Sequence, residues 1–140
     1  MSSNRRPLKS LGQNFLVDQN IIAKIIDSAR IQPDDAVLEI GPGRGALTAQ
    51  LAQRAGRLVL IEFDHALAAY HRDQHKDNER VTVIDADVLK VDLAAVLSET
   101  PRTWNVVANL PYNISTEVLF RLLEVHDRLS RMTLMLQKEV

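Results

Sequence analysis

Four consecutive residues combine side-chain and backbone groups that suit chemistry on an aromatic amine. They are Asn109-Leu110-Pro111-Tyr112, directly after an apolar run that ends at Ala108. The amino nitrogen of adenine is a poor nucleophile because its lone pair is delocalised. An asparagine oxygen and a carbonyl next to proline can accept hydrogen bonds from both N–H groups of the amine, which favours lone-pair density aimed outward, while a tyrosine can stack on an extruded base. The alternative is a turn with a packed tyrosine, and the four residue types together favour amine presentation.

A glycine-rich segment earlier in the chain has the composition of a ligand-binding loop. Glu39-Ile40-Gly41-Pro42-Gly43-Arg44-Gly45 lies between an apolar run and a helical pattern. Glycines let the backbone approach a ligand closely, and a helix N-terminus supplies free N–H groups. This position favours a nucleotide-like ligand over a tight structural turn. The third glycine comes one residue too early for the dinucleotide fingerprint, which argues against NAD and a nicotinamide dehydrogenase.

Two acidic positions follow later apolar runs. Glu62 comes about twenty residues after the first glycine, where a carboxylate can accept hydrogen bonds from both hydroxyls of a ribose. It can equally be a surface acid beside Asp64, which would cap the next helix. Asp87 can accept from an adenine amine while Val88 flanks the ring, or it can simply cap a helix. If these three apolar runs are neighbouring strands, a glycine or an acid follows each of them at the same edge of a sheet.

Apolar periodicity predicts the elements that must position these residues. Short apolar runs alternate with amphipathic segments along the whole chain. The predicted strands are 36–40, 58–61, 81–84, 104–108 and 132–136, and the predicted helices are 21–29, 46–55, 67–71, 93–97 and 116–125. This alternation indicates an α/β fold with a parallel sheet covered by helices on both faces, and ligands at the carboxyl ends of its strands.

Composition sets broad limits on the class of protein. The apolar fraction of 46% and the charged fraction of 25% are ordinary for one globular domain, and no apolar run reaches the roughly 20 residues of a membrane span. We therefore expect a cytoplasmic protein. With no cysteine and no metal-ligand spacing among the four histidines, no metal site is expected. The net charge of −1 gives no overall basic field; Arg5, Arg6 and Lys9 form either a basic arm or a solvated terminus.

Three motifs together resemble those of the KsgA-type small-subunit rRNA adenine dimethyltransferases. They are GQNFL at 12–16, EIGPGRGALT at 39–48 and NLPYNIST at 109–116. The resemblance covers nearly the whole chain, and the combination is highly specific for rRNA adenine methyltransferases. It implies a Rossmann-like methyltransferase fold and S-adenosyl-L-methionine as cofactor, with methyl transfer to the N6 amines of two adjacent adenosines near the 3′ end of small-subunit rRNA.

The resemblance also implies a role for each site residue. Asn109, Leu110, Pro111 and Tyr112 would present the target amine, with Asn109 also at the cofactor. The other implied cofactor-binding residues lie in four places. Gln13, Asn14 and Leu16 belong to the N-terminal motif, where Asn14 and Leu16 would cover the methionine end of the cofactor. Gly41 and Gly43 would approach it from the glycine loop, Glu62 would hold its ribose, and Asp87 and Val88 would flank its adenine.

The resemblance implies two segments: a basic arm with a cofactor motif at 1–16 and a methyltransferase domain at 17–140. Because the last predicted strand runs almost to Val140, we expect the sheet to be truncated after its fifth strand and the chain to be a fragment without the family's helical C-terminal domain. A monomer that acts on the small ribosomal subunit or its precursor is expected. The alternatives are a large-subunit rRNA adenine methyltransferase of the macrolide-resistance type and a non-catalytic RNA-binding assembly module.

Overall fold

Five parallel strands form the centre of the molecule in the order β3-β2-β1-β4-β5. The structure is a computed structural model and describes residues 18–137. Its strands are β1 (Ala36–Ile40), β2 (Arg57–Glu62), β3 (Val81–Asp85), β4 (Trp104–Pro111) and β5 (Leu129–Gln137). All residues of β1 are buried because helices cover both faces of the sheet, as a continuous apolar run requires. The predicted parallel α/β sheet is confirmed.

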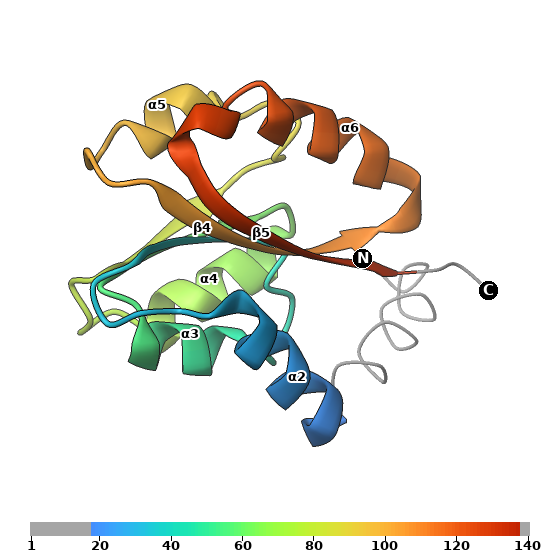
Figure 1. Ribbon diagram of the computed structural model, residues 1–140. Helices are drawn as coiled ribbons and strands as arrows, with labels where there is room; N and C mark the ends of the chain where they lie inside the picture. The colour runs from blue at the N-terminus through green and yellow to red at the C-terminus, as the bar shows by residue number, and fades with distance from the viewer. Residues whose placement is uncertain (1–17, 138–140) are drawn as a thin grey trace.

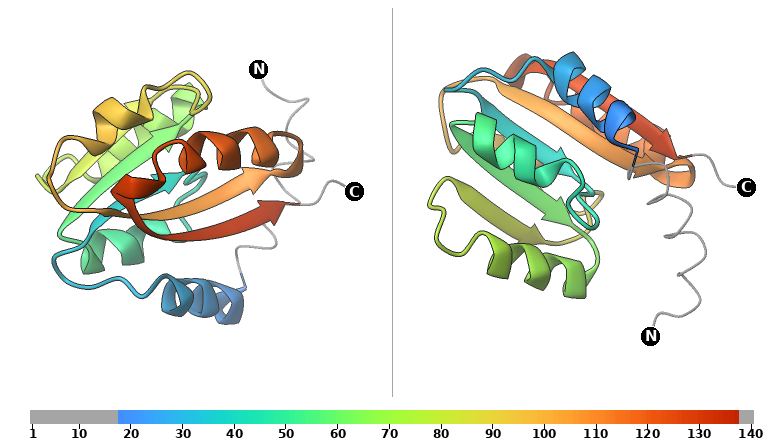
Figure 2. Two further views of the ribbon diagram at one scale, coloured as in Figure 1. Left: turned by 45° about the horizontal axis from the view of Figure 1, so that its top comes forward. Right: turned by 90° about the horizontal axis from the view of Figure 1, so that it is seen from below.

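The helices form two layers, one on each face of the sheet (Figure 1). They are α2 (Gln19–Ala29), α3 (Thr48–Arg54), α4 (His65–Gln74), α5 (Leu93–Leu97) and α6 (Tyr112–Leu123), followed by the 3-10 helix η2 (His126–Arg128). Helices α2, α3 and α4 lie side by side on one face, and α5 and α6 lie on the other (Figure 2). No helix within residues 18–137 has the length and apolar character needed to cross a membrane.

Each helix layer closes its own hydrophobic core. On the first face, Ile26 of α2 and Leu51 of α3 pack with Leu60 of the sheet. On the second, Leu97 of α5 and Leu122 of α6 belong to the other cluster, which also contains Trp104. Because alternate residues of a strand point to opposite faces, every strand contributes to both cores and its carboxyl end is held firmly in place.

The strand order of the sheet reverses between β1 and β4, which makes this position the topological switch point. Strands β2 and β3 are added on one side of β1, and β4 then pairs with the other side, with Ile40 opposite Ala108. In open parallel sheets, ligands bind where the strand order reverses, outside the carboxyl ends of the strands. This point lies between the glycine-rich segment after β1 and the segment that begins at Asn109.

Several element boundaries differ from the sequence predictions. The helix predicted to begin at 116 begins at Tyr112, directly after the extended N-cap residue Pro111. Strand β4 extends through Asn109 to Pro111 because β5 pairs with it that far. The helix predicted from 46 begins at Thr48, and β5 begins at Leu129. Asp18 caps α2 by accepting from the N–H of Asn20 at 2.9 Å.

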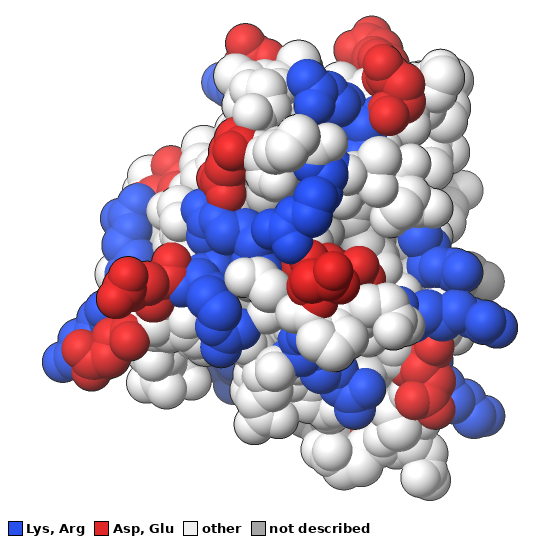
Figure 3. Space-filling model, turned by 60° about the vertical axis from the view of Figure 1, so that its left-hand side comes forward, with Lys and Arg blue, Asp and Glu red and all other residues white. Residues whose placement is uncertain are grey.

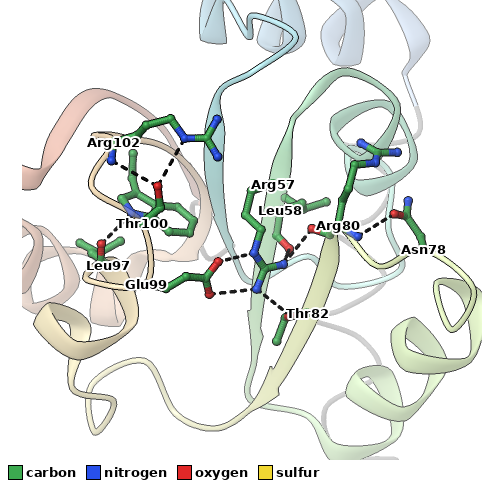
Figure 4. Close-up of polar contacts among 10 residues, drawn as sticks. Arg57, Leu58, Asn78, Arg80, Thr82, Leu97, Glu99, Thr100 and Arg102 are labelled. Atoms are coloured by element: carbon green, nitrogen blue, oxygen red, sulfur yellow. Dashed lines mark hydrogen bonds and ion pairs between the residues drawn. The ribbon is translucent and has the colours of Figure 1, made fainter.

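The opposite edge of the sheet, at the amino ends of the strands, is held by arginines. Arg57 binds the carboxylate of Glu99 and donates to Thr82 Oγ1 at 2.8 Å (Figure 4). Arg80 donates to the carbonyl of Ala52 at 3.0 Å, and Arg102 donates to a carbonyl of the loop before β1. With this edge turned toward the viewer, Lys and Arg lie among Asp and Glu (Figure 3). These arginines therefore connect neighbouring strands, helices and loops rather than form a uniformly basic face.

Candidate active site

The glycine-rich loop after β1 adopts a backbone that its glycines make possible. Gly41 has φ of 71° and Gly43 has φ of 59°, both in the left-handed region that side chains disfavour. A Cβ atom on Gly41 would lie 2.6 Å from the backbone oxygen of Asn109, so this glycine permits close approach to β4. Among residues 18–137, nothing lies within 4 Å of a Cβ atom on Gly43, so the described part of the chain leaves that side of the loop open. The loop therefore passes against Asn109 and presents an open face at Gly43.

Glu62, at the end of β2, holds the glycine loop. Its Oε1 accepts from the N–H of Gly43 at 3.0 Å, and its Oε2 accepts from the N–H of Asp64 at 2.9 Å. The side chain is buried, so the alternative of a surface acid is wrong. Asp64 caps α4 by accepting from the N–H of Ala66 at 2.9 Å, as that alternative predicted. Glu62 thus lies where a ligand seated on Gly43 would meet it.

Glu39 is an acid that the sequence analysis left without a role. It lies inside β1 with 1% of its surface exposed, and burial raises its pKa to about 8. The hydroxyl of Thr48 donates to its Oε1 at 2.7 Å and partly opposes that effect, while the charge of Glu62 adds to it. Glu39 is therefore mainly protonated at neutral pH. A single acid in an apolar strand was the signal that could have identified it.

The acids after β3 lie beside the end of β2. The N–H of Ala86 donates to the carbonyl of Glu62 at 3.1 Å, which joins the two strand ends. Asp87 accepts from the N–H of Leu89 at 2.9 Å and stabilises a turn, but the next helix, α5, is capped by Asp92, so the alternative of a helix cap is wrong for Asp87. Val88 is buried in the core under α5 and α6. Roles for Asp87 and Val88 around an adenine ring stay predictions.

The segment at the end of β4 exposes some of its groups and buries others. Leu110 is buried in the core, so only its backbone can reach the site. Asn109 is 8% exposed, and its Oδ1 finds no hydrogen-bond partner among residues 18–137. Tyr112 is 64% exposed at the start of α6, so the alternative of a packed tyrosine is wrong. A buried carbonyl oxygen without a donor costs about 1–3 kcal/mol, which a bound amine would relieve.

The structure brings most of the predicted site residues to one edge of the sheet. Gly41 contacts Asn109, Gly43 contacts Glu62, and the β3 end contacts the β2 end. Gln13, Asn14, Leu16 and the basic arm lie outside the described residues. Within residues 18–137, no group of three or more acids and histidines is arranged to hold a metal ion. This edge therefore offers an open loop, carboxylates and an amide oxygen without a metal site.

The histidine His71 is the second residue at this edge that the sequence analysis did not assign to the site. It lies on the buried face of α4, and its Nε2 is 2.7 Å from the carbonyl oxygen of Gly43. The spacing from Leu67 and Ala68 identified it only as part of a helix face. No feature of the sequence indicated that this face reaches the glycine loop.

A parallel sheet of this order, with a glycine loop after β1, acids at the carboxyl ends of β2 and β3 and N-L-P-Y at the junction of β4 and α6, defines a Rossmann-like methyltransferase fold. Solved structures agree. The 23S rRNA methyltransferase ErmE matches with a TM-score of 0.66 and 32% identity over 84% of this chain and 43% of that chain. A dimethyladenosine transferase from Plasmodium falciparum matches with a TM-score of 0.67 and 30% identity over 85% of this chain and 42% of that chain.

Sequence comparison identifies the family within this class. The family model described as ribosomal RNA adenine dimethylase matches residues 4–140, and the chain belongs to this family. The ribosomal RNA small subunit methyltransferase A of Geobacter metallireducens is 52% identical over 136 residues, covering 96% of this chain and 50% of the relative. That of Acinetobacter baylyi is 49% identical over 133 residues, covering 94% and 48%. The chain thus spans about half the length of these relatives.

Proposed function

We propose that this chain binds S-adenosyl-L-methionine at the carboxyl edge of its sheet and forms the catalytic part of a small-subunit rRNA adenine dimethyltransferase. Two adjacent adenosines near the 3′ end of the rRNA would each receive two methyl groups on N6. The observation that carries this proposal is the contact of Gly41 with Asn109, because the two loops leave only 2.6 Å between the oxygen of Asn109 and a Cβ position on Gly41. A donor held by the first loop therefore lies next to an amine held by the second.

The residues present fit this cofactor. Gly43 combines a left-handed φ with an open side, which leaves room for a ligand against the backbone. Glu62 reaches the same loop and would accept from the ribose hydroxyls, and Asp87 would accept from the adenine amine. Family membership further favours Asn14 and Leu16 at the methionine end, with Gln13 beside them. When bound, the cofactor supplies a methyl group on a sulfonium that is already activated for transfer.

The chain's own residues would prepare the acceptor nitrogen. Asn109 Oδ1, which finds no partner among the described residues, would accept a hydrogen bond from one N–H of the adenine N6 amine, and the backbone carbonyl before Pro111 would accept one from the other N–H. Both contacts would orient the nitrogen toward the methyl donor. The exposed ring of Tyr112 would stack on the extruded base. Because the methylated amine loses its proton readily, no strong general base is needed.

The small-subunit substrate is favoured over the large-subunit alternative by the degree of similarity. The relatives named for the small subunit are about half identical to this chain, whereas the 23S rRNA methyltransferase ErmE is 32% identical. The partner would accordingly be small-subunit rRNA or a precursor of the small subunit. A cytoplasmic monomer stays our prediction for this function.

Two experiments test the proposal at separate levels. Calorimetry should detect S-adenosyl-L-methionine binding with one site per chain and no binding of NADH; absence of cofactor binding would refute it. Radiolabelled methyl transfer should then modify undermethylated small subunits but not large subunits, and N6,N6-dimethyladenosine should appear after digestion. Label on large subunits would favour the macrolide-resistance type, and RNA binding without transfer would favour the assembly module.

A further inference from the structure

His71 has no part in the methyl transfer described above, yet it contacts the loop that would hold the methyl donor. Only 1% of its surface is exposed, and its Nε2 lies 2.7 Å from the carbonyl oxygen of Gly43. The helix that carries it, α4, begins at the end of β2 and packs against β2 and β3. A histidine from the helix layer thus reaches the glycine loop across the edge of the sheet.

Gly43 is held at both of its backbone polar groups. Its N–H donates to Glu62 Oε1 at 3.0 Å, and its carbonyl oxygen faces His71 Nε2 at 2.7 Å. These two contacts come from different elements, a strand end and a helix. They fix the orientation of both peptide groups that flank the open position of Gly43, where a flexible glycine would otherwise rotate.

The imidazole also packs against the next glycine of the loop. A Cβ atom on Gly45 would lie 3.1 Å from His71 Cε1, and Gly45 has φ of 90°. The ring makes an edge-on contact with Tyr70 and stacks near His75, with ring centroids 5.2 Å and 6.3 Å away. The loop and the ring therefore fit together closely, with little freedom for either.

The contact determines the tautomer of His71. A carbonyl oxygen only accepts hydrogen bonds, so Nε2 must carry the proton. The other ring nitrogen, Nδ1, is buried without a partner among residues 18–137. Burial lowers the pKa of His71, which keeps the ring neutral. A neutral Nε2–H donor aimed at the loop is therefore the resting state.

We propose that His71 is a positioning residue that holds the Gly43 peptide in the conformation that binds the cofactor. This inference rests on the proposed function, since it deepens the description of the same site. His71 does not touch the reacting atoms. Its donor fixes the loop before the ligand arrives, so its loss should weaken binding of the cofactor and leave the transfer step unchanged at saturating cofactor.

Calorimetry on three variants and the wild-type chain tests this role. His71→Leu keeps an apolar side chain in the buried site but removes the donor, and the Kd for S-adenosyl-L-methionine should rise about ten-fold. His71→Gln supplies an amide N–H and should restore the Kd to within about three-fold of wild type. His75→Leu replaces the histidine that directly follows α4 and stacks near His71; it controls for the loss of an imidazole beside the site and should bind normally. In methyl-transfer assays, KM for the cofactor should rise in His71→Leu with kcat unchanged.

The outcomes separate this inference from the proposed function. A wild-type chain that does not bind S-adenosyl-L-methionine would refute the function itself. If wild type binds and His71→Leu binds equally well, or His71→Gln is as weak as His71→Leu, the positioning role is wrong. Should His71→Leu fail to fold, the ¹⁵N shifts of the wild-type ring decide, because a proton on Nδ1 instead of Nε2 would contradict the donor role.

Discussion

Two glycines in the same loop provide a matched test of how the two halves of the site meet. Gly41 and Gly43 both have left-handed φ values, 71° and 59°. An alanine at either position therefore carries a similar backbone cost, about 1–2 kcal/mol. The surroundings of the two positions differ, because a Cβ on Gly41 would lie 2.6 Å from the backbone oxygen of Asn109, whereas no described residue would lie within 4 Å of a Cβ on Gly43.

The difference in surroundings gives a difference in stability. Gly41→Ala adds an overpacking cost of about 1–3 kcal/mol to the backbone cost, because the atom it meets is backbone oxygen in a buried strand. The total for Gly41→Ala is about 2–5 kcal/mol, against about 1–2 kcal/mol for Gly43→Ala. Since a domain has only about 5–15 kcal/mol of stability in total, this difference should be clear in urea denaturation.

The two variants should also separate in function. Gly41→Ala pushes against Asn109, so we expect kcat to fall because the amine acceptor moves. Gly43→Ala places a methyl group on the open side of the loop, so we expect the Kd for S-adenosyl-L-methionine to rise about ten-fold. Equal losses of stability in both variants would refute the close contact between the loops, and unchanged cofactor affinity in Gly43→Ala would refute the open face as the ligand surface.

Three further substitutions address single groups at the site. Asn109→Ala should lower kcat at least about a hundred-fold, with the Kd for the cofactor changed less, and normal turnover in a methyl-transfer assay would contradict amine presentation. Glu62→Ala should mainly raise the cofactor Kd in calorimetry, because it removes the acceptor of the Gly43 N–H. Folding raises the pKa of Glu39 from 4.5 to about 8, so its carboxyl group binds a proton more tightly in the folded protein. The stability that this proton binding adds to the fold is fully present below about pH 4.5 and is lost as the pH rises toward 8. Urea denaturation should therefore show Glu39→Gln gaining stability relative to wild type between pH 5 and 8, and a constant difference would contradict the raised pKa.

The fold was predictable because apolar burial determines it. The run 36–40 was identified as a strand covered on both faces, and all of β1 is buried. The boundary at 109–112 was not predictable in the same way. Asn109 and Pro111 are poor strand residues, and only pairing with β5 extends β4 through them. Tertiary pairing overrode local propensity there.

The site was predictable where residues lie next to the ends of strands, and not where the contact comes from a helix face. Position at strand ends made Gly43 and Glu62 candidates, the resemblance assigned them to the site, and Glu62 Oε1 accepts from the N–H of Gly43 at 3.0 Å. His71 lies on a helix whose buried face looks like any other in the sequence. The role of Glu39 was not identified because a protonated acid can occupy an apolar strand without a charged partner. Both were missed because their roles depend on depth of burial, which periodicity does not measure.

The reversal of strand order at β1 explains why donor and acceptor groups can be held so rigidly. Gly41 follows β1 and Asn109 lies near the end of β4, and these strands are paired neighbours with Ile40 opposite Ala108. Any shift of one loop relative to the other would have to break sheet hydrogen bonds and move side chains in both cores. We therefore expect the distance between the methyl donor and the amine to be set by the sheet, and affinity for the cofactor to be set by the groups around Gly43.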